Sequence, residues 1–307
     1  MPGGVLLGIA TAVSWGSSDF LARFATRTTG TTRALLGMQS WGALFVTILL
    51  VFSRNWGHLF DGSGWQPWAW GVLAGAINTG AMFALYRSFE LGKMAVVAPI
   101  SASYPALTVI LSLLSGEKLS LYRGLGIIAA FAGVILVATG EKTSNSLSVP
   151  SEFDPCSLRP QVSAHGTGAP VRGILWAVVA AIGFGFLFWL LGAHIIARTG
   201  AIPTVWLIRL TGTALTFCIA LATGVPLRIP NKRTRAQLYS MGFFDTAAFA
   251  FSNLGMRIEQ VAVVSVLGSL YGAVTVALAA AFLRERIALV QWSGIAAIFL
   301  GIILMNA

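Results

Sequence analysis

Residues 173–193 read GILWAVVAAIGFGFLFWLLGA, a stretch that contains no charged residue. A helix that crosses the hydrocarbon core of a bilayer needs roughly 20 predominantly apolar residues. The stretch is apolar on every side, so it does not have the polar face of a helix that lies on a membrane surface. It also lacks the alternation of polar and apolar residues that is typical of a membrane β-barrel strand. Residues 173–193 therefore predict a membrane-spanning helix.

The rest of the chain has the same character. Of its 307 residues, 56% are hydrophobic and 10% are charged, whereas soluble proteins carry about 25% charged residues. Runs of about 20 apolar residues, bounded by charges, Gly and Pro, predict ten spans at 3–21, 32–52, 66–86, 94–114, 121–140, 172–193, 202–223, 236–256, 261–283 and 287–305. The first run has no basic segment before it and no cleavage site after it, so we expect a span and not a removable signal peptide. The chain is predicted to be an all-α integral membrane protein, multi-pass in the cell (inner) membrane.

The net charge of +10 suggests an anionic partner. The 20 Lys and Arg residues are spread over short connections, however, and only Lys232, Arg233 and Arg235 form a cluster. Basic residues next to membrane spans are typical of contact with lipid headgroups. We therefore expect the lipid bilayer, and no nucleic acid, as the partner of these charges.

One long polar connection divides the ten spans into five and five. We predict a first repeat at 1–140, a polar linker at 141–171 and a second repeat at 172–307. The two halves match in a co-linear series, with residues 95–98 (AVVA) recurring as 262–265 (AVVS). The same series pairs Tyr104 with Tyr271, Gly126 with Gly294, Gly133 with Gly301, Asn78 with Asp245, and Gln39 with Arg209, with shifts of one to three residues between segments. Since five is odd, the second half must enter the bilayer from the opposite side, which predicts ten transmembrane helices as an inverted 5+5 repeat.

Three motifs carry a family resemblance: residues 15–18 (WGSS), 96–105 (VVAPISASYP) and 116–120 (GEKLS), the last with a second copy around Glu285 and Arg286. With these motifs the chain resembles the drug/metabolite transporter superfamily in its ten-helix form with two EamA domains. The resemblance implies a secondary transporter that exports small polar metabolites, amino acids first, by alternating access. Efflux of drugs or toxic compounds is the alternative. The small multidrug branch of the superfamily uses a glutamate in its first helix, and residues 12–16 contain no acid, which weakens that alternative.

Polar side chains inside spans are costly and are functional candidates. Counted along the helices, six candidates lie about 7–13 residues from the membrane face that holds the N-terminus, near the bilayer centre. They are Gln39, Asn78, Tyr104, Arg209, Asp245 and Tyr271.

Arg209 and Asp245 are predicted to form an ion pair between neighbouring helices. Either the pair is structural, or Arg209 receives a substrate carboxylate or phosphate while Asp245 holds an amine or couples transport to protons. A third interpretation is that Arg209 lines water with no specific role. Gln39 and Asn78 bind substrate or bond to a neighbouring helix. Asp19 is interpreted as the partner of Arg23 near the membrane interface.

Other functions and partners receive little support from the sequence. The residues His58, His165 and His194 form no metal-binding pattern, so neither a metal nor an intramembrane enzyme is expected. The sequence contains no repeated ring of charged residues of the kind that channels use, so a channel is disfavoured. No nucleotide-binding loop or cofactor motif is present either. We expect a small-molecule substrate, protons as a candidate coupling ion, and a monomer or homodimer.

The orientation in the membrane is left open by two conflicting arguments. The loops on the N-terminal side carry five basic residues, Arg54, Lys118, Arg123, Arg198 and Arg257, against fourteen on the other side. The positive-inside rule then places the N-terminus outside. The family resemblance implies cytoplasmic termini instead.

Overall fold

The computed structural model describes residues 3–91, 100–146, 169–227, 231–283 and 289–305, and these are helical apart from a loop at 54–65 and shorter turns. The first half contains α1 (Gly3–Thr29), α2 (Thr31–Ser53), α3 (Gln66–Leu91), α5 (Tyr104–Leu114) and α6 (Leu121–Ser146). The second half contains α7 (Ala169–Leu190), the π-helix η1 (Leu191–Ile195), α8 (Ile196–Thr199), α9 (Ala201–Ala222), α10 (Lys232–Gly255), α11 (Val261–Ser269), α12 (Tyr271–Leu283) and α13 (Leu289–Met305).

The helices follow the ten predicted spans and confirm the all-α membrane fold. Each span coincides with helix over its described part; residues 94–99 and 287–288 lie outside that part. Within the described residues, five helices are long and apolar enough to cross a bilayer, and four shorter apolar helices accompany them. Large apolar side chains such as Phe52, Ile128 and Ile303 are exposed on the outside, where lipid would cover them.

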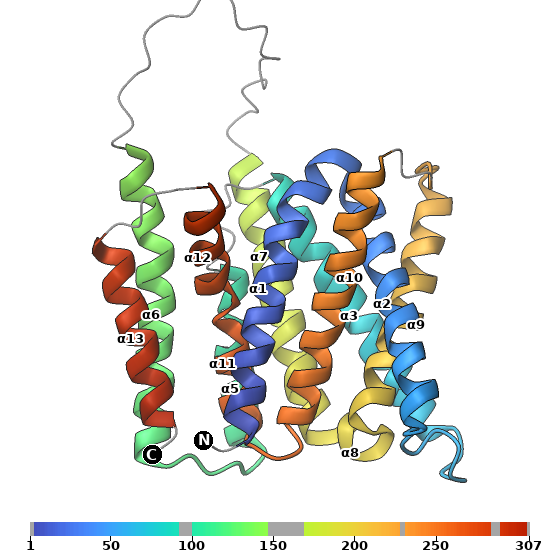
Figure 1. Cartoon of the computed structure of the whole chain (residues 1–307). Helices are drawn as coiled ribbons and strands as arrows, with labels where there is room; N and C mark the ends of the chain where they lie inside the picture. Colours follow the sequence, from blue (N-terminus) through green and yellow to red (C-terminus); the bar gives the residue numbers. More distant parts are fainter. Residues whose placement is uncertain (1–2, 92–99, 147–168, 228–230, 284–288, 306–307) are drawn as a thin grey trace, which may run out of the picture.

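The packing of the helices follows the inverted repeat. Helices α1 and α7, which begin the two halves, run in opposite directions (Figure 1). Helix α1 packs against α10 as α7 packs against α3, and these two contacts exchange when the halves are exchanged. The helix pairs α2 with α9 and α6 with α13 each join equivalent elements of the two halves. The halves therefore interlock through a pseudo-two-fold axis.

The contact between α6 and α13 shows this symmetry at atomic detail. A Cβ added to Gly133 would lie 2.6 Å from the carbonyl oxygen of Gly294, and a Cβ added to Gly301 would lie 2.7 Å from that of Gly126. These are the glycines that the repeat register pairs. Only glycine permits such close backbone contact, as in other membrane helix pairs.

Candidate functional site

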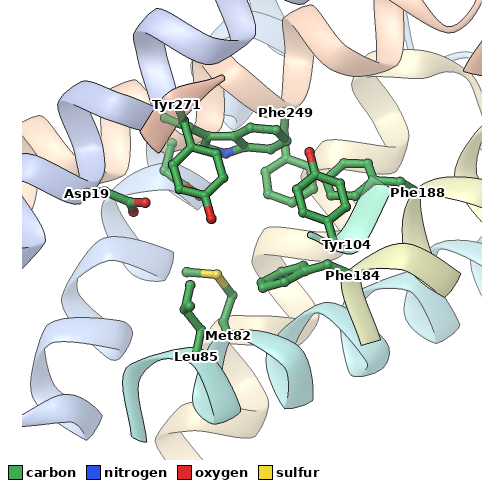
Figure 2. Close-up of a pocket in the computed structure, with 10 residues that line it drawn as sticks. Asp19, Met82, Leu85, Tyr104, Phe184, Phe188, Phe249 and Tyr271 are labelled. Atoms are coloured by element: carbon green, nitrogen blue, oxygen red, sulfur yellow. The ribbon is translucent and has the colours of Figure 1, made fainter. Parts of the chain in front are cut away.

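A central cavity lies between the two halves, with about 400 Å³ of empty space. Both halves contribute side chains, as Figure 2 shows. The lining residues are Trp15, Asp19, Met82, Leu85, Tyr104, Phe184, Phe188, Asp245, Phe249 and Tyr271.

Two interrupted helices place the tyrosines of this cavity. The fourth span breaks at Ser103, directly before Tyr104 begins α5, and the ninth breaks at Leu270, directly before Tyr271 begins α12. In both breaks the backbone makes an i→i−3 hydrogen bond, from Ser103 to Ile100 and from Leu270 to Leu267. Discontinuous helices at equivalent positions of two repeats are a hallmark of transporter binding sites.

The aromatic side chains form a packed cluster on one side of the cavity. The Trp15 ring lies 5.3 Å from the rings of both Phe188 and Phe249, in edge-to-face contact. The Tyr104 ring lies 5.1 Å from that of Phe188, and the Tyr104 hydroxyl donates a hydrogen bond of 3.2 Å to the carbonyl of Ser265. These contacts hold a rigid apolar wall, against which the face of an apolar or cationic solute can pack.

Two carboxylates face the cavity, and their surroundings differ. Asp245 forms an ion pair with Arg209, which is fully buried. Asp19 has no ion-pair partner among the described side chains. It lies one helical turn beyond Trp15 on α1, and no Lys or Arg is found among the described lining residues. The cavity wall is therefore aromatic and acidic.

Behind Asp245 lies a polar layer that does not line the cavity. Arg209 donates a hydrogen bond of 2.9 Å to the side-chain oxygen of Gln39, and its guanidinium carbon lies 4.9 Å from the centre of the Phe249 ring. Asn78 is buried, and both of its amide atoms lack a hydrogen-bond partner among the described residues. The pseudo-two-fold axis brings Gln39 and Arg209 together because they are equivalent positions of the two repeats.

Three of the six candidate residues line the cavity, and three do not. Tyr104, Tyr271 and Asp245 are lining residues. Arg209 and Gln39 belong to the polar layer behind them, and Asn78 is buried in α3. The expected ion pair between Arg209 and Asp245 is present.

Sequence reasoning missed Asp19 as a cavity residue. Its expected partner, the side chain of Arg23, lies outside the described part of the structure. The available signal was the spacing of four residues between Trp15 and Asp19, which places both on one face of a helix. The residues Phe184, Phe188, Phe249, Met82 and Leu85 carried no signal, because aromatic and aliphatic residues fill every span.

Comparison with known proteins agrees with this architecture. A solved crystal structure of another protein matches with a TM-score of 0.74 at 18% sequence identity, over 98% of this chain and 95% of that one. At this identity the likeness shows the fold alone. No curated protein matches the chain. Residues 2–139 and 171–307 each match the model of the EamA-like transporter family. The chain thus belongs to the EamA-like transporter family and is a multi-pass membrane transporter.

Proposed function

We propose that the protein is a secondary transporter of small solutes that carry an amino group on an apolar body. The observation that carries this proposal is the composition of the central cavity. Six of its ten lining residues are aromatic, two are carboxylates and none of them is basic. Carboxylates attract an ammonium group, and aromatic faces attract both cations and apolar surfaces. Hydrophobic amino acids and lipophilic amines share these two features.

The two substrate classes differ in one group: a hydrophobic amino acid carries a carboxylate, and a lipophilic amine does not. The sequence hypothesis assigned that group to Arg209. In the folded chain Arg209 is committed to Asp245 and Gln39 and does not line the cavity. This arrangement favours amines without a carboxylate, which is the class that drug and toxic-compound efflux would handle.

We propose alternating access as the mechanism. Two inverted halves that interlock through a pseudo-two-fold axis can exchange conformations, so that the cavity opens to one face and then to the other. The breaks before Tyr104 and Tyr271 offer hinge points in the two halves. Export across the cell membrane is the direction that the family resemblance implies.

A proton-coupled cycle needs a carboxylate that is charged in one state and neutral in another. The sequence nominated Asp245 for this role. Arg209 already neutralises Asp245, whereas Asp19 has no cation beside it among the described residues. We therefore propose that Asp19, and not Asp245, is the carboxylate whose charge changes in the cycle and that it receives the solute amine. Asp245 and Arg209 then form a fixed polar support beside it.

Counterflow in proteoliposomes with three matched solutes tests the proposal. Phenylethylamine carries only the amine, phenylpropionate carries only the carboxylate, and phenylalanine carries both. We expect phenylethylamine to exchange and phenylpropionate to be inert. Exchange of phenylalanine without phenylethylamine would show that the carboxylate is required, and would return Arg209 to the substrate site.

A further inference from the structure

A second site-like feature lies on the outer surface, away from the central cavity. It is a groove with about 800 Å³ of empty space, lined by Trp65, Gln66, Ala69, Trp70, Leu73 and Arg198. We call it the Arg198 groove. It joins the beginning of α3 to α8, at the end of the molecule that also holds both chain termini (Figure 1).

Arg198 is the charged residue of this groove, and its hydrogen-bonding capacity is largely unused. One of its N–H groups donates to the carbonyl of His194 at 2.8 Å, and its guanidinium carbon lies 5.6 Å from the centre of the Trp70 ring. Among the described residues no carboxylate pairs with it. A guanidinium has five N–H donors, so most of them remain available to a ligand.

The groove is built around Arg198 by several fixed contacts. The π-helical turn at 191–195 precedes α8, and the His194 ring stacks on Trp70 at a centroid distance of 6.3 Å. The Thr199 hydroxyl donates a hydrogen bond of 3.2 Å to the carbonyl of Pro67. These contacts tie α8 to the first turn of α3, so the guanidinium is positioned before any ligand arrives.

The position of the groove indicates which ligand it meets. Arg198 is next to the last residue of its helix, and Trp70 is in the second turn of α3. Both therefore lie where spans end and lipid headgroups begin. Trp65 is 74% exposed and Leu73 is 43% exposed, and both point away from the protein core. A cation on such a surface faces the phosphate groups of the bilayer.

We propose that the Arg198 groove binds the headgroup of an anionic phospholipid. In this arrangement the guanidinium donates two parallel hydrogen bonds to the lipid phosphate. Trp65 and Trp70 flank the headgroup, and the acyl chain lies along Leu73. Lipid is the occupant we favour because the groove combines one cation with an apolar, outward-facing wall that a free anion would not use.

The test is a binding measurement on the purified full-length protein in detergent. Wild type is titrated with short-chain phosphatidylglycerol, with phosphatidylcholine of the same chain length and with inorganic phosphate, and bound lipid is counted by native mass spectrometry. We expect phosphatidylglycerol to bind most tightly. Arg198→Gln should weaken phosphatidylglycerol binding about tenfold. Arg198→Lys should keep only part of the wild-type affinity, because a lysine cannot donate two parallel hydrogen bonds to one phosphate.

Arg257→Gln provides the matched control, since Arg257 is an exposed arginine at the same end of the molecule. Equal losses from Arg198→Gln and Arg257→Gln would overturn the proposal, because general surface charge would then explain the binding. Inorganic phosphate that competes with phosphatidylglycerol at equal concentration would also overturn it, by indicating a soluble-anion site.

Discussion

At the scale of single residues, Asp19 and Asp245 face the same cavity, but only Asp245 has a described cationic side chain beside it. Asp245 shares its charge with Arg209, whereas Asp19 has no such partner in the described structure. A carboxylate without a partner inside a membrane is costly unless a bound cation or proton compensates it. Asp19 is therefore the lining residue whose negative charge a bound solute amine would compensate most.

We predict that Asp19→Asn abolishes counterflow of phenylethylamine and leaves the melting temperature near that of wild type. The amide keeps the size of the side chain but removes the charge that attracts the ammonium group. Asp61→Asn is the control, because Asp61 lies in the exposed loop after α2, where it pairs with His58. Unchanged transport by the Asp19 variant would exclude this residue from amine recognition.

The pair of Arg209 and Asp245 calls for a double-mutant cycle. Removing one member leaves the other charge buried without a partner, which costs about 3–5 kcal/mol. We expect Arg209→Gln and Asp245→Asn each to lower the melting temperature strongly. The double variant should be more stable than Arg209→Gln alone, because neither charge of the pair is then left buried without its partner. Additive losses in the double variant would contradict a direct pair.

At the scale of helices, the close contact between α6 and α13 depends on two glycines. Gly133→Ala and Gly301→Ala each place a methyl group within 2.7 Å of a facing carbonyl oxygen. We predict a similar destabilisation for both, about 1–3 kcal/mol, because overpacking forces the helices apart. The readout is thermal or denaturant unfolding in detergent micelles.

Gly124→Ala is the matched control on α6, since a Cβ at this position would meet no atom within 4 Å. It should be neutral or slightly stabilising, because alanine favours a helix over glycine. Unequal effects of the changes at Gly133 and Gly301 would argue against the symmetric packing of the two halves.

Helices also show where prediction from the sequence succeeds and where it stops. The apolar runs predicted the spans, and counting along them grouped Tyr104, Asp245 and Tyr271, which line one cavity. Depth does not give the rotation of a helix about its axis, and a span that is apolar on every side carries no signal for that rotation. Arg209 and Gln39 were therefore predicted at a suitable depth, yet they point into the helix interface behind the cavity.

At the scale of the whole molecule, the two halves are joined at one end by a polar contact that we call the terminal lock. Arg123, at the start of α6, pairs with Glu259 at 2.7 Å and donates to the side-chain oxygen of Gln260 at 2.8 Å. The side chain of Gln260 in turn donates to the carbonyl of Lys118 at 2.6 Å. The lock therefore joins the loop before α6 to the turn between α10 and α11.

Alternating access requires the terminal lock to open when the cavity faces the termini. We predict that tethering the two sides of the lock stops transport. In a chain with Cys156 and Cys218 replaced by serine, Arg123→Cys and Glu259→Cys are bridged with a bifunctional methanethiosulfonate. Counterflow should fall to background and return after reduction, because the tether blocks only the movement of one half against the other.

The control bridges His58→Cys to Asp61→Cys, a pair within one loop at the same end of the molecule. This tether crosses no boundary between the halves, so counterflow should continue. Full transport by the protein tethered from residue 123 to residue 259 would mean that the two halves do not separate at the lock. The movement that opens the cavity to the termini would then have to occur within a half, at the breaks before Tyr104 and Tyr271.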